Sequence, residues 1–412
     1  MDVDKTRLRT DIETNATFGA IETDDGRGRT VLTGTIPNQQ AREHLVDRLE
    51  QADMDVRIDA VGNIAGRWSP PSADAAPIAA GSHLDSVPEG GIFDGPLGVY
   101  AALEAVRTMQ DDGFEPTHPI EVVCFTEEEG QRFAEGMLGS SVTAGDRSIE
   151  TALDLTDSDG TTLDTALTES GFRGEDRIDA RDWDAWLELH IEQSGRLEAA
   201  DIPIGVVTTI TGITHCEVVI NGEANHAGTT SMVERTDGLT AASEFALDVE
   251  TAAQEIAKED DAAVGTVGSI LTHPNATNVV PGRVEMGIDV RSIEYSSMNE
   301  IVERARTSLA RIADERDVET HFEREFDLHP TPMSDHCRNV THKACETAGI
   351  DTLSMHSGAA HDTMHIASVT DAGLLFAPSR DGISHNPREW TDWDDCSTAA
   401  QTLTEALATL AA

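Results

Sequence analysis

The segment GSHLDSVPEGGIFDGPLG, residues 81–98, constrains the fold of this chain more than any other stretch. A short apolar run, residues 77–80, leads directly into His83 and Asp85, and Asp94 follows nine residues after Asp85. Five glycines lie within the segment. Burying ionisable groups is costly unless they are paired or hold a metal. An apolar strand that ends in one imidazole and two carboxylates therefore predicts a functional site at that end.

Apolar segments alternate with helical patterns along the rest of the chain. Residues 120–125 (IEVVCF) run into three glutamates, and another apolar segment, residues 185–189, runs into His190. The intervening residues 98–109 (GVYAALEAVRTM) have a helical pattern. Strands that alternate with helices predict an α/β fold with a mixed, largely parallel sheet. In such sheets ligands bind at the carboxyl ends of the strands, so we expect these polar residues to meet there.

The pattern changes at about residue 210. A strand-like segment, a helical segment, two further strands, a second helix and a last strand occupy residues 210–326. This β-α-β-β-α-β order is typical of a ferredoxin-like unit. We therefore expect an inserted α+β domain at 210–326. Residues 1–209 and 327–412 would together form the domain that carries the polar strand ends.

The net charge of the chain restricts the solvent conditions under which it folds and the partners that it can bind. Asp and Glu number 76 against 29 Lys and Arg, so the net charge is −47, and only three of the basic residues are lysines. Such self-repulsion destabilises a compact fold at low salt, whereas at 1 M salt the Debye length falls to about 3 Å. We expect a halophilic protein in a salt-rich cytoplasm. The charge argues against nucleic acid or an anionic membrane as a partner.

The chain shows no signal for export or for a membrane span. No apolar run approaches the roughly 18 residues that a span needs, and the start, MDVDKTRLRT, has no apolar signal region. The five cysteines form no CxxC pair, which predicts reduced, buried thiols. We therefore expect a cytoplasmic protein.

Five residues with nitrogen or oxygen ligands lie at ends of apolar runs or in glycine-flanked turns: His83, Asp94, Glu129, His190 and His385. Imidazole and carboxylate ligands without thiolates suit Zn, Mn, Co or Ni. They suffice for two divalent metal ions roughly 3.5 Å apart if one carboxylate is shared. Asp94 is the natural bridge, because a carboxylate offers two oxygens.

Neighbouring acidic residues are candidates for orienting a ligand and for acting as the general base. Asp85 lies two residues after His83 and on a strand would share its face, so it could orient that imidazole. Of Glu128 and Glu129, one can bind a metal while the other stays free as a general base. The spacing alone leaves open which does which. We interpret Glu127 as a solvated surface residue.

Six motifs carry a resemblance to a known family. GSHLDSVPEGGIFDGPLGV, EEEGQRF, ELHIEQSG, GEANHAGTT, SGAAHD and GISHNPRE occur in order between about Asn38 and the C-terminus. Together they resemble the amidase branch of the co-catalytic di-metal metallopeptidases. That branch contains N-carbamoyl-L-amino-acid hydrolases, β-ureidopropionases and allantoate amidohydrolases. The resemblance implies a catalytic domain with two metal ions and an inserted lid domain that also forms a homodimer.

The resemblance also assigns roles to residues. The five ligands named above would bind the metals with Asp94 bridging, and Asp85 would support His83. The last glutamate of EEEG, Glu129, would be the ligand and Glu128 the base.

Substrate contacts would come from both domains. By resemblance, His226 stabilises the developing oxyanion, Asn278 and Arg291 hold the substrate carboxylate, and Gln193 contacts the ureido group. Taken alone, His226 could instead be a surface histidine and Arg291 part of an exposed ion pair. Gln193 and Asn278 could be solvated amides. Ala360 stands where the family usually has glycine, at an expected backbone contact to substrate, and Ser231 stands where it usually has proline. We expect His226 and Asn278 to act on the site of the neighbouring subunit.

The implied function is metal-dependent hydrolysis of a linear amide or ureido C–N bond in a small carboxylate. N-carbamoyl-L-amino acids are the leading substrates, giving the amino acid, carbon dioxide and ammonia. Allantoate and N-carbamoyl-β-alanine are alternatives, and a dipeptide is a weaker one. His215 and Cys216 stand near the start of the lid strand, where allantoate-specific relatives carry an arginine, which disfavours allantoate. A metal-binding protein without catalysis would lack the base or a ligand, whereas Glu128 and all five ligands are present.

Overall fold

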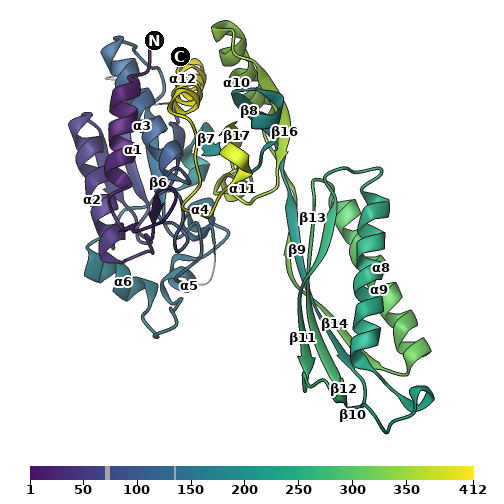
Figure 1. The fold of residues 1–412 in the computed structure, drawn as a ribbon. Helices are drawn as coiled ribbons and strands as arrows, with labels where there is room; N and C mark the ends of the chain where they lie inside the picture. The colour runs from purple at the N-terminus through teal and green to yellow at the C-terminus, as the bar shows by residue number, and fades with distance from the viewer. Residues whose placement is uncertain (70–74, 134–135) are drawn as a thin grey trace. The chain divides into compact units, whose positions relative to one another are not determined.

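The computed structural model describes residues 1–69, 75–133 and 136–412. The chain divides into two compact units (Figure 1). The first unit comprises Met1–Thr208 and Pro332–Ala412, and the second comprises Thr209–Thr331. The roles that the resemblance gives to these parts, catalysis and a lid that forms the dimer, stay predictions.

A nine-stranded sheet organises the first unit, in the order β15-β8-β17-β7-β5-β6-β4-β3, with β16 paired to β8. The four central strands β17, β7, β5 and β6 are parallel, and the flanking pairs β17–β8, β6–β4 and β4–β3 are antiparallel. The predicted mixed, largely parallel α/β sheet is confirmed. The strands are β3 (Asp55–Ile58), β4 (Ile64–Trp68), β5 (Ile78–His83), β6 (Ile120–Phe125), β7 (Ala185–Ile191), β8 (Ile204–Ile210), β15 (Thr331–Pro332), β16 (Thr352–Ser357) and β17 (Asp371–Ala377). A separate two-stranded ribbon joins β1 (Ala20–Ile21) to β2 (Gly28–Arg29).

The central strands are buried on both faces, which is why they appear in the sequence as continuous apolar runs. On one face, Ile78, Val122 and Leu187 pack in the main core with the long helices. On the other, Ala79, Val123 and Trp186 join a smaller cluster. The helices of this unit are α1 (Lys5–Asn15), α2 (Ile36–Gln51), α3 (Pro96–Asp111), α4 (Leu138–Ala144), α5 (Ile149–Leu153), α6 (Leu163–Ser170), α7 (Arg196–Ala200), α10 (Asp335–Ala348), α11 (Thr363–Ile366) and α12 (Trp393–Leu410), with short 3-10 turns at Ala180–Asp182 and Arg380–Gly382.

Helix α3 fixes the position of the loop that precedes it. It starts at Pro96, which favours the first turn of a helix because it has no N–H to satisfy. Its residues are buried from Pro96 through Met109, so it lies within the core rather than on the surface. The preceding residue, Gly95, has φ 81°, and a Cβ there would lie 2.5 Å from the carbonyl oxygen of His83. The end of β5 and the start of α3 are thereby held close together.

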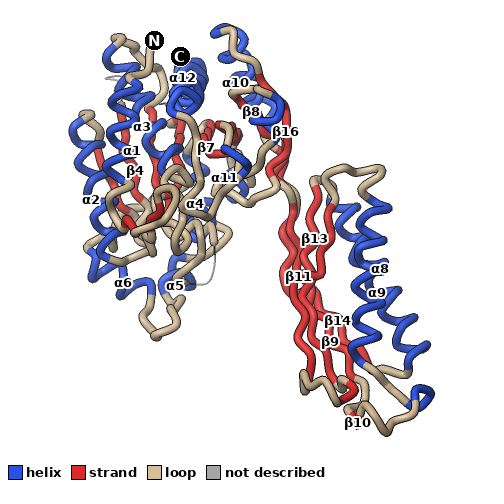
Figure 2. The backbone as a smooth tube through the Cα atoms, in the orientation of Figure 1, coloured by secondary structure: helices blue, strands red, loops and turns tan. Residues whose placement is uncertain are grey.

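The second unit is a four-stranded antiparallel sheet in the order β11-β13-β9-β14, with two long helices on one face (Figure 2). Its main elements follow the predicted β-α-β-β-α-β order: β9 (Gly212–Asn221), α8 (Gly238–Ile256), β11 (Val264–His273), β13 (Arg283–Ser292), α9 (Tyr295–Arg316) and β14 (Glu319–Leu328). A small ribbon joins β10 (Asn225–His226) to β12 (Val279–Val280), and a 3-10 turn spans Met232–Glu234. The core of this unit lies between the sheet and the helices, around Phe245, Ile288 and Ile301.

Two further expectations concern the whole chain. All five cysteines are free and buried, as predicted. Among the described residues, no helix combines the length and the apolar character that crossing a bilayer requires.

Candidate metal centre

Side chains from the ends of three parallel strands meet in the first unit. His83 is the last residue of β5, His190 is the penultimate residue of β7, and Glu128 and Glu129 follow shortly after β6. Because these strands are parallel neighbours, their carboxyl ends lie at one edge of the sheet. Asp94 comes from the loop before α3, and His385 comes from the loop before α12.

The Asp94 carboxylate lies at the middle of this group. Its Oδ1 is 3.5 Å from His83 Nε2 and 3.2 Å from His190 Nε2. Its Oδ2 is 3.5 Å from His385 Nε2, which in turn is 3.4 Å from Glu129 Oε2. Each oxygen of Asp94 therefore faces a different set of nitrogen and oxygen donors, which is the arrangement that a bridging carboxylate requires.

The donor atoms fit divalent metal ions. In two sets, His83–Asp94–His190 and Asp94–Glu129–His385, each residue offers one ligand atom within 4.8 Å of the others. Among the described residues the buried Nε2 of His83 has no hydrogen-bond partner, although a buried ring nitrogen is normally satisfied. Imidazole and carboxylate donors of this kind suit Zn, Mn, Co or Ni. These five residues would hold the two ions, with Asp94 shared.

Unbalanced negative charge at the site also favours a bound cation. Burial and the neighbouring Asp94 raise the pKa of Glu129 to about 8. Burial, with Asp362 and Glu129, raises the pKa of Glu128 well above its ordinary value despite the opposing effect of His83. Burial would lower the pKa of His83, but Glu128, Asp94 and Asp85 outweigh it and raise that pKa. Divalent ions would compensate for these crowded carboxylates.

Glu128 stands beside the two donor sets. Its Oε2 is 3.6 Å from His83 Nε2. A further possible donor set combines His83, Glu128 and Glu129, so the geometry alone does not separate a ligand from a base in this pair. The contact between Glu129 and His385 places Glu129 in the second donor set, which agrees with its predicted role as a ligand.

Asp85 contacts its neighbours differently from our expectation. β5 ends at His83, so Asp85 no longer shares a strand face with it. The Asp85 carboxylate oxygen is 3.8 Å from His83 Nδ1, whereas the Asp85 carbonyl oxygen is 3.2 Å from it. The carboxylate instead accepts hydrogen bonds from the backbone N–H groups of Glu128 at 3.3 Å and Glu129 at 3.1 Å. Asp85 therefore holds the backbone of both glutamates, while its carbonyl oxygen contacts His83.

The interpretation of Glu127 as a solvated surface residue is wrong. Glu127 is buried, and its Oε1 accepts hydrogen bonds from the backbone N–H groups of Arg132 and Phe133 at 2.7 and 2.8 Å. Its φ of 55° turns the chain after β6. A carboxylate that satisfies backbone donors can be buried at low cost, and spacing in an acidic triplet does not reveal those donors.

Gln193 lies against the bridging carboxylate. Its Nε2 donates to Asp94 Oδ2 at 2.9 Å, and its buried Oε1 has no hydrogen-bond partner in the part of the chain that the structure describes. The backbone of Gln193 has φ 57°, a conformation that few residues other than glycine adopt and that concentrates at functional sites. The predicted substrate-contact residue thus lies beside the candidate metal ligands, and no described residue donates to its side-chain oxygen.

Sequence reasoning missed several residues near this centre. His361 is buried, its ring centroid lies 4.6 Å from that of His190, and its Nε2 is 3.1 Å from Ser357 Oγ. It belongs to the SGAAHD motif, directly after the half-buried Ala360, but no role was assigned to it. Arg29 and Glu389 were also missed, and both contact the loop that carries Asp94. Glu389 lies within GISHNPRE, whereas no motif pointed to Arg29.

The predicted contacts of the inserted domain lie in the second unit. His226 and Asn278 are exposed and adjacent, because β10 pairs His226 with Val279 and Ala227 N–H donates to the Asn278 carbonyl at 2.9 Å. Arg291 lies near the other end of β13, paired in register with Ile213. Its Nε is 3.0 Å from Asp289 Oδ1, and Asp289 Oδ2 is 3.1 Å from His215 Nε2.

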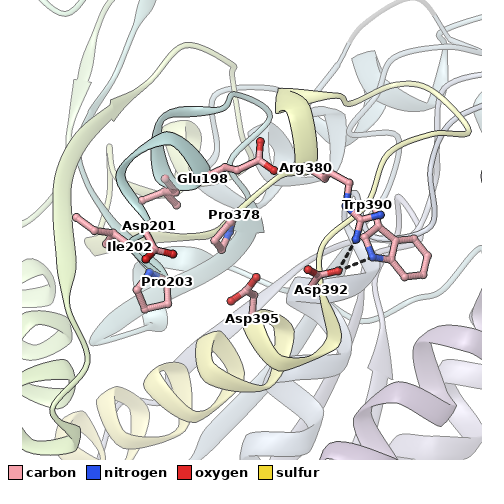
Figure 3. Close-up of a pocket in the computed structure, with 10 residues that line it drawn as sticks. Glu198, Asp201, Ile202, Pro203, Pro378, Arg380, Trp390, Asp392 and Asp395 are labelled. Carbon is pink, nitrogen blue, oxygen red and sulfur yellow. Dashed lines mark hydrogen bonds and ion pairs between the residues drawn. The ribbon is translucent and has the colours of Figure 1, made fainter.

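A separate pocket of about 200 Å³ lies in the first unit and is shown in Figure 3. Four carboxylates line it, from Glu198, Asp201, Asp392 and Asp395, together with Arg380 and Trp390. Asp392 accepts hydrogen bonds from Arg380 at 2.6 Å and from Trp390 Nε1 at 2.8 Å. None of the five candidate metal ligands lines this pocket, so it is distinct from the centre described above.

Comparison with known proteins identifies the family and agrees with the fold. Residues 79–409 match the model of Peptidase family M20/M25/M40. An N-carbamoyl-L-amino-acid amidohydrolase of Paenarthrobacter aurescens is 39% identical over 396 residues, covering 94% of each chain. An allantoate amidohydrolase of Bacillus subtilis (strain 168) is 34% identical over 402 residues, covering 97% of this chain and 96% of that protein. The crystal structure of a hydantoinase/carbamoylase family amidase from Burkholderia multivorans has a TM-score of 0.93 and 36% identity, covering 100% of this chain and 98% of that one. This chain belongs to Peptidase family M20/M25/M40.

Proposed function

We propose that the protein hydrolyses a linear ureido or amide C–N bond in a small carboxylate, with N-carbamoyl-L-amino acids as its leading substrates. One water molecule is consumed, and the products are the amino acid, carbon dioxide and ammonia. The observation that supports this most strongly is the Asp94 carboxylate, which faces His83 and His190 with one oxygen and His385 with the other, beside the carboxylate of Glu128.

The five ligands would hold two divalent ions, which we propose to be Zn, Mn, Co or Ni. Bound there, the ions would act as Lewis acids toward the scissile carbonyl and make water more acidic. Glu128 would take a proton from the attacking water at its carboxylate and return it to the leaving nitrogen. Burial raises the pKa of the Glu128 carboxylate, which strengthens it as a proton acceptor for this exchange.

The amide of Gln193 and the imidazole of His226 are suited to bind the substrate. Gln193 has a buried Oε1 that no described residue binds, and this oxygen can accept a hydrogen bond from an N–H of the ureido group. His226 Nδ1 accepts a hydrogen bond from Gly228 N–H at 3.0 Å, which leaves the ring proton on Nε2. His226 can therefore donate through Nε2 to the oxygen that gains charge in the reaction.

The second unit supports the proposal that two subunits build each site. His226 and Asn278 lie near the Arg283 end of β13, whereas Arg291 lies near its other end. Eight residues of strand separate those ends by about 26 Å, which is far longer than a carbamoyl amino acid. If all three residues contact one substrate, they must come from two copies of the chain. We therefore propose a homodimer in which Arg291 acts on its own site and His226 and Asn278 act on the partner site.

An exposed strand edge supports a dimer through the same unit. β11 is an edge strand, and its Val264, Ile270 and Leu271 are 48%, 47% and 61% exposed. Unpaired edges with apolar side chains readily pair with another chain. We therefore propose that β11 lies in the dimer interface.

We also propose that the protein works in a salt-rich cytoplasm, because its net charge of −47 would otherwise destabilise the compact fold.

A substrate panel tests the proposed activity. Purified protein in molar KCl with added Zn, Mn, Co or Ni is assayed with N-carbamoyl-L-amino acids, N-carbamoyl-β-alanine, allantoate and dipeptides, and released ammonia and amino acid are quantified. We expect the highest kcat/KM with an N-carbamoyl-L-amino acid. Preference for allantoate would move the assignment to the alternative that the Bacillus subtilis relative represents. Cleavage of dipeptides alone would overturn the proposal.

A further inference from the structure

The direction of the Asp94 carboxylate depends on a loop without regular structure. Residues 84–94 form neither helix nor strand, yet most of them, including Leu84, Ile92 and Phe93, are buried. Buried backbone N–H and C=O groups need partners. Helix α3 supplies one, from Leu97 N–H to the Phe93 carbonyl oxygen at 3.0 Å, but most of the loop must find its partners elsewhere. The groups that do supply them therefore determine where Asp94 points.

Arg29 binds the carbonyl groups of this loop. It is fully buried, and its guanidinium donates to the carbonyl oxygens of Gly91 at 3.0 Å, Leu84 at 3.1 Å, Asp94 at 3.2 Å and Asp85 at 3.4 Å. Its backbone N–H donates to the Gly90 carbonyl at 2.9 Å. One side chain thus ties the two ends of the loop to each other.

Glu389 binds the N–H groups of the same loop. Its Oε1 accepts from Phe93 N–H and Asp94 N–H, both at 3.1 Å. Its Oε2 lies 3.1 Å from Ser384 Oγ, which is 2.9 Å from Asp94 Oδ2. A Cβ on Gly91 would lie 2.1 Å from Glu389 Oε1, so only glycine permits this approach. Asp94 is therefore held at its N–H by Glu389 and at its C=O by Arg29.

The use of arginine here is unusual for a buried cation. Buried charges are normally paired directly with an opposite charge, but within the described part of the chain Arg29 contacts carbonyl oxygens rather than a carboxylate. Arginine suits this position because its planar fork presents five fixed donors, whereas the lysine ammonium has three donors on a flexible stem. This position therefore requires hydrogen-bond donors that point in particular directions, as well as a positive charge.

We propose that Arg29 and Glu389 form a positioning pair that holds the backbone of residues 84–94 and so aims the Asp94 carboxylate between the two donor sets. This inference rests on the proposed di-metal function. Neither residue touches a metal or the substrate; both act through the backbone of Asp94. Outer contacts of this kind typically change metal affinity or activity by roughly 10–100-fold.

Cobalt titration separates positioning from a purely structural role. Protein freed of metal with a chelator is titrated with Co²⁺ in molar KCl, and the visible absorption of Co²⁺ reports the number, affinity and geometry of the ions. The variants are Arg29→Lys, which keeps the charge but loses the fork, and Glu389→Ala, which loses the acceptor. Glu389→Gln keeps one acceptor oxygen for the two N–H groups and serves as the conservative rescue. Arg107→Lys is the matched control, because Arg107 is a buried arginine that instead pairs with Asp11 at 2.5 Å.

We expect Arg29→Lys and Glu389→Ala to weaken binding of at least one Co²⁺ by roughly 10–100-fold and to change the spectrum. With metal saturating, kcat should fall while KM stays close to that of the wild type. Glu389→Gln should restore most of the affinity. Arg107→Lys should lower the melting temperature without changing Co²⁺ affinity or spectrum.

Two results would be decisive against parts of this scheme. If Arg29→Lys and Glu389→Ala bind two Co²⁺ ions with wild-type affinity and spectrum, the positioning pair is wrong. If the wild type itself binds fewer than two ions, the proposed metal centre fails instead, whatever the variants do. Where one variant does not fold in molar KCl, the other carries the test.

Discussion

At the scale of single residues, the two adjacent glutamates after β6 differ in what they face. Glu129 Oε2 lies 3.4 Å from His385 Nε2, within the donor set that also contains Asp94. Glu128 Oε2 lies 3.6 Å from His83 Nε2. Asp85 accepts hydrogen bonds from the backbone N–H groups of both residues, and so fixes the backbone from which the two side chains extend.

This difference predicts the behaviour of two matched variants. Glu128→Gln should retain both metal ions and lose roughly 10²–10⁴-fold in kcat, the usual effect of removing a general base. Glu129→Gln should lose metal as well as activity, because an amide is a weaker ligand than a carboxylate. Metal content by elemental analysis and steady-state kinetics on the same preparations check both. Loss of metal from Glu128→Gln with retention in Glu129→Gln would reverse the two assignments.

The residues that sequence reasoning placed near one another share one property. His83, His190 and Glu129 each lie at or just beyond the end of an apolar strand, and parallel strands bring those ends together. Arg29 and Glu389 were missed because their partners are backbone groups far away in the sequence, and no residue spacing encodes such contacts. Glu127 was misjudged for the same reason, since its burial depends on two backbone donors.

At the scale of elements, the β3–β4 hairpin is closed by a glycine turn and a buried acid. Gly62 has φ 85° in the turn, which glycine adopts without strain. Asp59 Oδ1 accepts from the N–H groups of Val61 at 3.0 Å and Asn63 at 2.9 Å, and its Oδ2 accepts from Asn63 Nδ2 at 2.9 Å. The alternating pattern of residues 55–68 (DVRIDAVGNIAGRW) favours two paired strands, whereas no residue spacing reveals that a buried acid closes them.

Asp59 gives a pH-dependent prediction. Burial raises the pKa of Asp59 to about 6 in the folded protein, against about 3.9 in an unfolded chain. The folded state therefore binds this proton more tightly, and the resulting stability is present below about pH 4 and is lost as pH rises through about 6. The free energy of unfolding of the wild type relative to Asp59→Asn should fall by about 3 kcal/mol over that range. Urea unfolding of both proteins in molar KCl measures it, and a difference that does not vary with pH would contradict it.

The exposed edge of β11 gives a second prediction at this scale. Charged side chains on an edge strand oppose pairing with another chain. The double variant Ile270→Lys, Leu271→Lys should therefore shift the proposed dimer to monomer in molar KCl, as measured by light scattering after size-exclusion chromatography. Phe326→Lys, on the opposite edge strand β14, is the control, because Phe326 is similarly exposed at 43%. A dimer that survives the double variant but not Phe326→Lys would place the interface at β14.

At the scale of the whole molecule, charge sets the conditions under which the fold holds. Even if every one of the 29 basic residues paired with one acid, 47 acidic residues would remain unpaired. Exposed arginines already contact several acids at once, as Arg311 does with Glu244, Asp248 and Glu315. Composition predicted this imbalance directly, and screening by salt is the physical remedy for it.

The melting temperature should therefore rise steeply between dilute buffer and molar KCl. Most of the gain should come below about 1 M, where the Debye length falls to about 3 Å and screening of the repulsion nears completion. Differential scanning calorimetry across KCl concentrations measures the effect. An equal osmolality of sucrose is the control, since it is excluded from the protein surface without screening charge. A melting temperature that is the same in dilute buffer and in 1 M KCl would refute the prediction.

The separation of His226 from Arg291 along one sheet leads to a prediction about the dimer as a functional unit. If His226 acts on the partner site, a dimer of Glu128→Gln and His226→Ala subunits has one site with both residues intact. Equal mixing with free exchange should then restore about a quarter of wild-type activity, because half of the dimers are mixed and each has one working site of two. Lowering and then restoring the KCl concentration permits the exchange. The control mixes Glu128→Gln with Arg291→Ala: since Arg291 is proposed to act on its own site, every site keeps one defect and no activity should return. Recovery in the control but not in the first mixture would mean that the two ends of the sheet have exchanged roles, with Arg291 acting across the dimer and His226 within its own subunit.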